Sequence, residues 1–102
     1  MTDNKYRLTP KEAQLKIREI AQYGFITPGP HCQKQMRKRG FDFQDIEYLL
    51  KNCKIVNPPE YDNDHDDWKY EAIGHVIDGD KATVITVIVS HNKVFCVTVM
   101  DK

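Results

Sequence analysis

A histidine followed by four cations marks the part of the chain best suited to acid-base chemistry. Residues 31–40 read HCQKQMRKRG, so His31 precedes Lys34, Arg37, Lys38 and Arg39. Histidine exchanges a proton near neutral pH, and the planar guanidinium of arginine fits the oxygens of a phosphate. Metal-free RNA cleavage needs a base for the 2′-hydroxyl, an acid for the leaving oxygen and a cation for the developing charge. The segment is suited to RNA, and the simpler alternative is a solvated helix face with its cations near the helix C-terminus.

A second row of polar side chains lies on a predicted strand. Alternation in WKYEAIGH places Lys69, Glu71 and His75 on one face and Trp68 and Tyr70 on the other. The polar row can be catalytic, or it can form an ordinary cross-strand charge ladder. The two aromatic rings can stack on bases, although burial between helices and sheet is commoner for such residues.

An acidic loop, DNDHDD at residues 62–67, precedes this strand. Asp62, Asp64 and Asp66 have the spacing of a calcium-binding EF-hand loop, but Asp67 replaces its glycine and Ile73 its bidentate glutamate. The loop is therefore expected to be a solvated turn, or a surface for a protein partner, that lies at the rim of any RNA site.

The composition indicates one folded domain, residues 1–102. Fifteen Lys and Arg balance fifteen Asp and Glu, so only a local patch of charge can attract nucleic acid. No apolar run reaches the ~20 residues that span a bilayer, and the N-terminus lacks a signal-peptide core. Three widely spaced cysteines, Cys32, Cys53 and Cys96, favour buried reduced thiols in a cytoplasmic protein. We expect no cofactor, no metal and no membrane contact.

Helical periodicity dominates the first half of the chain. The first helix begins after the N-cap Thr9 and ends at Gly24; the second spans residues 31–39 and ends at Gly40; the third begins after the N-cap Asp42. The positions expected to face inward are Ala13, Ile17, Ile20 and Ala21 in the first helix, Cys32 and Met36 in the second, and Ile46, Leu49 and Leu50 in the third.

Strand periodicity dominates the second half. The stretch KIVNPPEY, residues 54–61, contains a short strand that Pro58 and Pro59 terminate. Residues 68–77, 81–90 and 93–100 form a meander with tight turns, one of which contains His91. Residues 25–30, FITPGP, are expected to be a loop. The predicted fold class is α+β, with three N-terminal helices packed on one face of a four-stranded, mainly antiparallel sheet.

Two short patterns resemble known families. The His31, Met36-Arg37, Arg39-Gly40 and Asp45-Ile46 series resembles RelE-like toxin domains of the Barnase–EndoU–Colicin–RelE fold. The RGFDF segment, the loop of Tyr61, Asp64, His65 and Trp68, and the terminal meander resemble the MqsR mRNA interferases. Together the two resemblances cover the chain from Leu8 to its end.

The resemblance implies the toxin of a type II toxin-antitoxin system, with a RelE/MqsR-like fold. Such a protein is a cytoplasmic, metal-independent endoribonuclease that acts on translated mRNA, with ribosome association left open, and is inhibited by a cognate antitoxin. Lys69 stands where MqsR-type toxins have an active-site glutamine, Val56 lies nearest to their catalytic lysine, and Ala82 aligns with their catalytic tyrosine. Either His31 and Arg37 perform the catalytic roles of those missing residues, or catalysis is weak or absent.

The leading hypothesis assigns a role to each candidate residue. His31 is the general base or acid, Arg37 and Arg39 clamp phosphate, Lys69 stabilises charge, and His75 or Tyr70 is the second proton-transfer group. RNA binding is assigned to Lys34, Lys38, Arg39 and Tyr61. These assignments require the second helix to face the open side of the sheet, so that the groups lie in one cleft.

Two rival hypotheses stay open. One is a non-catalytic protein-binding module of the same fold, which uses the acidic loop and an exposed strand edge. The other, weaker, is a metal-dependent hydrolase that uses His65 and the neighbouring acids.

Overall fold

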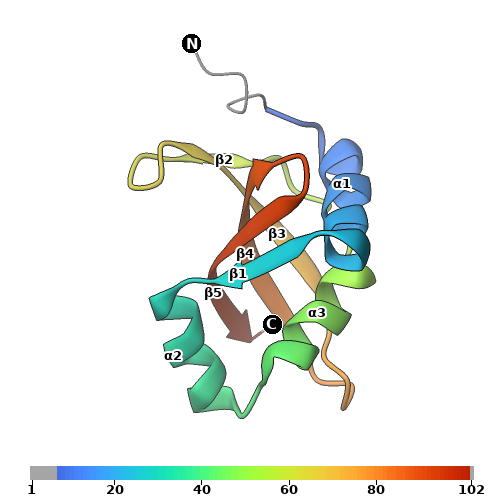
Figure 1. The fold of residues 1–102 in the computed structure, drawn as a ribbon, viewed down its shortest axis with the longest axis vertical. Coiled ribbons are helices and arrows are strands. Elements are labelled where there is room, and N and C mark those ends of the chain that lie inside the picture. Colours follow the sequence, from blue (N-terminus) through green and yellow to red (C-terminus); the bar gives the residue numbers. More distant parts are fainter. Residues whose placement is uncertain (1–6, 102) are drawn as a thin grey trace.

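The computed structural model describes residues 7–101, which form three helices and one five-stranded sheet (Figure 1). The helices are α1 (Pro10–Tyr23), α2 (Pro30–Arg39) and α3 (Phe43–Lys51). The strands are β1 (Phe25–Pro28), β2 (Glu60–Asp62), β3 (Asp67–His75), β4 (Lys81–Ser90) and β5 (Lys93–Asp101). The predicted α+β class is confirmed. No helix among these residues is long and apolar enough to cross a membrane.

The sheet has five strands in the order β1-β5-β4-β3-β2, so the predicted number of four is wrong. The meander from β2 to β5 is antiparallel, whereas β1 pairs with β5 in parallel. The expected loop at 25–30 contains this edge strand, because Phe25 N–H donates to Asn92 O at 2.8 Å and Gly29 N–H to Cys96 O at 2.9 Å.

The strand that was predicted before Pro58 and Pro59 does not form. Lys54 makes only an isolated bridge with Ile73 of β3, and β2 begins after the prolines, at Glu60. Pro58 and Pro59 lie between these two places, and proline has no N–H to donate to a ladder.

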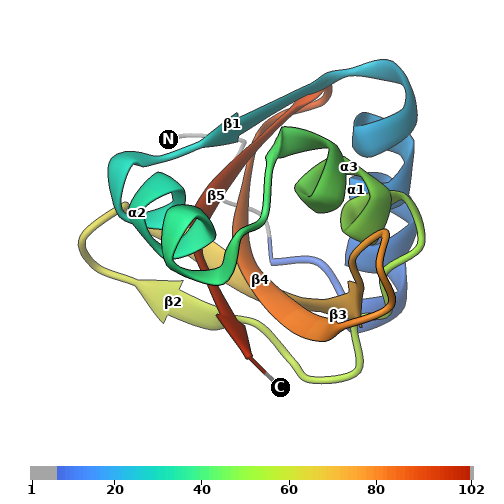
Figure 2. The same cartoon turned by 90° about the horizontal axis from the view of Figure 1, so that it is seen from below.

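The helices divide into two groups around the sheet. α1 and α3 pack against each other within the curve of the sheet, and α2 packs along β5 beyond the end of β1 (Figure 2). The ion pair between Arg39 Nε and Asp101 Oδ1, at 3.1 Å, ties the end of α2 to the end of β5.

Local capping explains where the helices begin and end. A capping box starts α1 at Thr9, as predicted, and α3 begins at the predicted N-cap Asp42, where Asp45 completes a second box. Gly24 caps the C-terminus of α1, and Gly40 caps α2 in the left-handed region with φ 71°. These four helix boundaries follow from short-range interactions that the sequence alone predicts.

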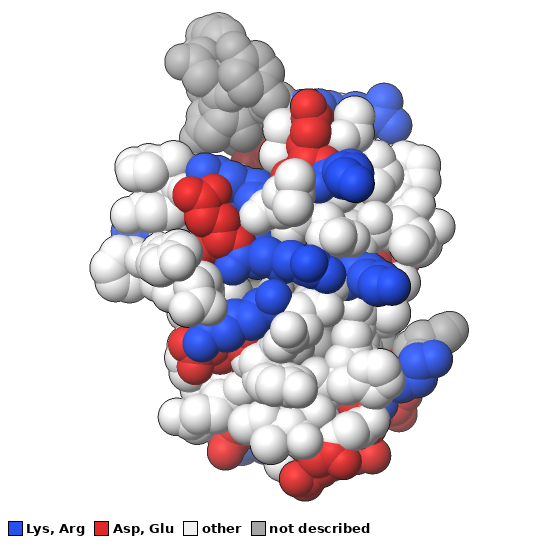
Figure 3. Space-filling model, turned by 90° about the vertical axis from the view of Figure 1, so that its right-hand side faces the viewer, with Lys and Arg blue, Asp and Glu red and all other residues white. Residues whose placement is uncertain are grey.

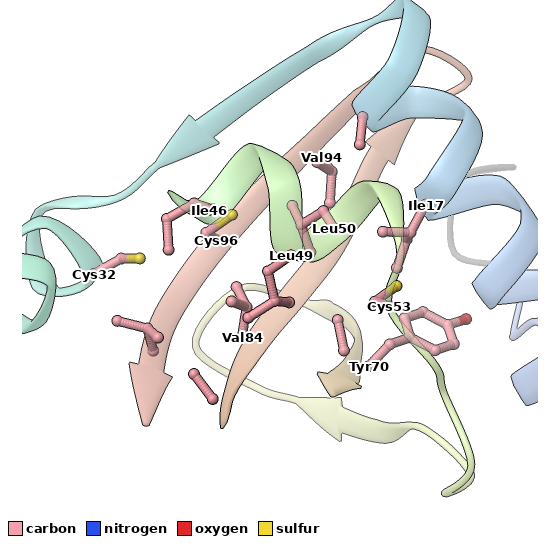
Figure 4. Packing of buried hydrophobic residues seen from close by; sticks show 14 of the residues in the cluster. Ile17, Cys32, Ile46, Leu49, Leu50, Cys53, Tyr70, Val84, Val94 and Cys96 are labelled. Atoms are coloured by element: carbon pink, nitrogen blue, oxygen red, sulfur yellow. The ribbon is translucent and has the colours of Figure 1, made fainter. Parts of the chain in front are cut away.

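The hydrophobic core lies between α1, α3 and the sheet, and α2 closes one end (Figure 4). Every helix position that was expected to face inward is buried. The three cysteines are free and buried, as expected, and burial raises the pKa of the Cys53 thiol to about 11. The face of the sheet away from α1 and α3 is where functional side chains can be exposed.

Candidate catalytic site at the open face of the sheet

The open face carries the polar row that the sequence predicted on β3. Lys69, Glu71 and Ile73 are each partly exposed, while Tyr70 and Ala72 between them are buried against the helices. The row borders a hollow of about 290 Å³. The hollow is lined by Pro58, Glu60, Lys69, Glu71, Ile85, Val97, Thr98 and Met100.

A histidine-aspartate pair lies beside this row, in the loop between β2 and β3. His65 Nδ1–H donates to Asp62 Oδ2 at 2.7 Å. The Asp62 side chain is only 10% exposed, whereas that of His65 is 36% exposed. No hydrogen bond within residues 7–101 involves Nε2 of His65 in the structure, so the second ring nitrogen is available to a ligand. The pair is therefore an oriented imidazole with one free nitrogen.

The electrostatics of the pair favour an ionised carboxylate. Burial acts to raise the pKa of Asp62, but the hydrogen bonds from His65 and from the Asp64 backbone, with the charges of His65 and Lys69, leave that pKa lowered overall. An ionised carboxylate accepts the Nδ1 proton, so Nε2 of a neutral His65 carries a lone pair. That is the form a general base requires.

Short-range contacts hold the loop in this shape. Asp62 Oδ1 accepts the N–H of Asp64 at 2.9 Å, which closes an Asx turn. The Tyr61 hydroxyl donates to Asp66 Oδ1, and Asp66 adopts the left-handed region with φ 53°. The ring of Tyr61 also packs edge-on against Trp68, with centroids 5.3 Å apart.

Phe95 connects the pair to the N-terminus of α2. The rings of His65 and Phe95 have centroids 5.4 Å apart, and Phe95 also packs on Gly29, where a Cβ would lie 2.4 Å from its Cζ. Gly29 is the N-cap of α2, and His31 lies in the first turn, where helix N–H groups have no intrahelical partner. An aromatic ring thus separates the imidazole of His65 from the positive end of α2.

The remaining residues predicted to be catalytic do not gather in one place. His31 and Arg37 are exposed on α2, which packs on β5 and β1 rather than on β3. Tyr70 lies on the helix-covered face, 2% exposed, and its hydroxyl accepts the N–H of Leu8 at 2.9 Å. His75 lies six residues along β3 from Lys69, or about 20 Å. The convergence of His31 and Arg37 with β3 that the sequence suggested is therefore not observed.

The residues assigned to RNA binding also lie in two separate groups. Lys34 and Lys38 are exposed on α2, at spacings that place both on the same side of the helix as His31. Arg39 is held by Asp101 and by the Gln35 side chain, and Tyr61 by Asp66. The lysines are thus free to meet a phosphate chain, whereas Arg39 and Tyr61 have structural partners.

Lys69 differs from these residues because it lies close to the pair. Glu60 is its cross-strand partner, yet no salt bridge to Lys69 occurs among the described residues. Its charge contributes to lowering the pKa of Asp62. The ammonium group is therefore a cation within electrostatic range of Asp62.

His65 is the functional candidate that sequence reasoning undervalued, because the only chemical role it was given was that of a metal ligand. The signal was present, since Asp and His three residues apart in a tight loop can meet. In the part of the chain that the structure describes, no three His, Cys, Asp or Glu side chains come together as metal ligands. The geometry instead pairs His65 with one carboxylate.

Comparison with known families places this chain. A family model described as a domain of unknown function, DUF4258, matches residues 29–101. The chain belongs to the DUF4258 family. The match begins at Gly29 and includes α2, α3, the His65–Asp62 pair and the whole β2–β5 meander, so the candidate site lies inside the family's domain. No curated protein and no solved structure matches the chain.

Proposed function

We propose that the protein is a metal-independent endoribonuclease with His65 as its general base. The observation that carries the proposal is the 2.7 Å hydrogen bond that fixes His65 Nδ1 on Asp62 and leaves Nε2 free beside Phe95. Nε2 takes the 2′-hydroxyl proton of a nucleotide whose base stacks on Phe95. The 2′-oxygen then attacks the adjacent phosphorus, and the P–O5′ bond breaks to give a 2′,3′-cyclic phosphate and a free 5′-hydroxyl.

Lys69 supplies charge, and solvent supplies the second proton. A water molecule protonates the departing 5′-oxygen, since His31 lies on α2, which packs on β5 and β1 rather than on β3. The ammonium group of Lys69 stabilises the charge on the phosphorane. Asp62 acts as a positioning residue, since it holds His65 in the tautomer with its proton on Nδ1.

The distribution of cations supports RNA binding along α2. His31, Lys34 and Lys38 form an exposed row on the side of α2 away from the buried Cys32 and Met36. A second band of Lys and Arg crosses the side of the molecule that carries α1 and α3 (Figure 3). The first row begins at His31, two residues after Gly29, on which Phe95 packs, so it is the one expected to hold the phosphate backbone of the substrate.

The biological role that we propose is that of a toxin whose activity is held in check by a partner protein. The RelE-like and MqsR-like patterns support this role, because both families are RNA-cleaving toxins with antitoxins. We propose translated mRNA as the substrate and the cytoplasm as the place of action.

The experiment is cleavage of a defined RNA by purified protein in EDTA. Wild-type protein is expected to cut the RNA, and His65→Gln to lower the rate by about 10²–10⁴-fold, the usual contribution of a general base. His75→Gln, which changes an exposed histidine at the far end of β3, is the matched control and should keep wild-type activity. Intact RNA with the folded wild-type protein, or full activity in folded His65→Gln, would refute the proposal.

A further inference from the structure

The hollow on the open face combines an apolar floor with an acidic rim. Ile85, Val97 and Met100 supply apolar lining, and Glu60 and Glu71 lie at its edge. Glu71 is held in place because Asn57 Nδ2 donates to its Oε1 at 2.9 Å. The volume of about 290 Å³ suits one or two amino-acid side chains rather than a whole cofactor.

The charge that lines the hollow is acidic overall, since Glu60 and Glu71 face one cation, Lys69. The adjoining loop, residues 62–67, adds four aspartates to this end of the sheet, although the chain as a whole is neutral. Carboxylates on two neighbouring strands repel a phosphate chain, and they attract ammonium and guanidinium groups. The complementary ligand is therefore cationic and partly apolar.

We propose that this hollow docks a segment of a partner protein in which a leucine-sized apolar side chain is flanked by lysine or arginine. The apolar side chain fills the space between Ile85 and Met100, and the flanking cations meet Glu60 and Glu71. Glu60 lies opposite Lys69 across the β2–β3 pair, and Glu71 lies two residues from Lys69 on β3, so the two carboxylates are diagonal neighbours on one face. A short extended segment can bring one cation to each of them.

The bound segment would also cover Lys69, which lines the hollow and acts electrostatically on Asp62. By covering Lys69, the docked segment would inhibit the His65 site, and this inhibition rests on the proposed ribonuclease activity. Docking itself does not depend on that activity, and the two can be measured separately.

The direct test is binding of a short fluorescent peptide with alternating Lys and Leu, followed by polarisation and by backbone amide NMR of the labelled protein. Glu60→Gln and Glu71→Gln should each weaken binding roughly twofold to fivefold at low salt, as expected for one exposed charge pair. Glu47→Gln, which removes a carboxylate on α3, is the control and should leave affinity unchanged. The largest amide shifts should fall on Lys69, Ile85 and Thr98.

Three other results would overturn the inference. They are equal binding of a Glu-Leu peptide, amide shifts confined to other surfaces, and shifts at the hollow produced by an RNA oligonucleotide instead of the peptide. A second copy of the chain as occupant would appear as a concentration-dependent dimer without peptide, and it would also overturn the choice of partner. RNA cleavage in EDTA is measured with and without peptide. Uncut RNA without peptide means that the nuclease proposal fails, whereas absence of peptide binding means that the docking proposal fails.

Discussion

Replacing Tyr70 with phenylalanine separates a structural role for this residue from a catalytic one. The tyrosine is 2% exposed, and its hydroxyl accepts the N–H of Leu8 at 2.9 Å, which ties the entry of α1 to β3. Tyr70→Phe keeps the ring and removes this one bond. The proposed site lies on the other face of the sheet, so cleavage should not depend on the hydroxyl.

The expected cost follows from the burial of the lost partners. A hydrogen bond of this kind contributes about 1 kcal/mol net, and an amide left without its acceptor adds to the loss. We therefore expect the free energy of unfolding to fall by about 1–2 kcal/mol. For a domain of this size each kcal/mol corresponds to roughly 4–8 °C in Tm.

Thermal unfolding followed by circular dichroism measures this change, and RNA cleavage in EDTA measures activity on the same sample. Tyr48→Phe is the matched control, because Tyr48 is 46% exposed on α3 and should change stability by less than about 0.5 kcal/mol. Loss of cleavage in a stably folded Tyr70→Phe protein would contradict the purely structural role assigned to the Tyr70 hydroxyl. An unchanged Tm would contradict the contribution assigned to the bond with Leu8.

Four further perturbations test individual features. Gly29→Ala should lower the free energy of unfolding by about 1–3 kcal/mol, because the added Cβ would overlap the Phe95 ring. Urea denaturation measures this change, and a midpoint equal to that of the wild type would contradict the close contact. Asp42→Ala should cost about 1 kcal/mol by removing the N-cap of α3, measured in the same titration; no change would mean that the cap is dispensable. The lowered pKa of Asp62 means that the unfolded chain binds its proton first as the pH falls. Wild-type stability should therefore drop between the usual carboxyl pKa of 3.8 and the lowered value, and Asp62→Asn should show a smaller drop when unfolding is measured against pH. Burial raises the pKa of the Cys53 thiol to about 11, so this thiol should resist iodoacetamide at pH 8 until urea unfolds the protein. Mass spectrometry measures the alkylation, and rapid alkylation of the folded protein would contradict the burial of Cys53.

The parts of the fold that sequence reasoning predicted correctly depend on neighbours in the chain. The N-caps Thr9 and Asp42 bond to groups three residues along the chain, and Gly40 needs only its own left-handed backbone. The β3–β4 and β4–β5 turns are equally local. Such features require no knowledge of what lies across the molecule.

The parts that were missed depend on distant pairing. β1 forms only because residues 25–28 meet residues 93–96, and its short Pro-containing sequence has no strand pattern of its own. The same parallel pairing directs α2 toward β5, and β4 then lies between β5 and β3. His31 and Arg37 therefore could not reach the β3 row, although each is chemically suited to RNA.

The candidate site combines both kinds of information. The Asp62–His65 spacing is local, and the sequence displayed it. The contact of His65 with Phe95, and of Phe95 with Gly29, joins three segments that only the folded chain brings together. Burial of Asp62 likewise depends on the folded loop.

The most direct test of the central claim is the chemical identity of the RNA ends made in EDTA. Wild-type protein incubated with a defined oligonucleotide should give 2′,3′-cyclic phosphate and 5′-hydroxyl ends by mass spectrometry, while folded His65→Gln should give almost none in the same time. Uncut RNA with wild-type protein, 5′-phosphate ends, or the same products at the same rate from His65→Gln would contradict the role assigned to the His65–Asp62 pair.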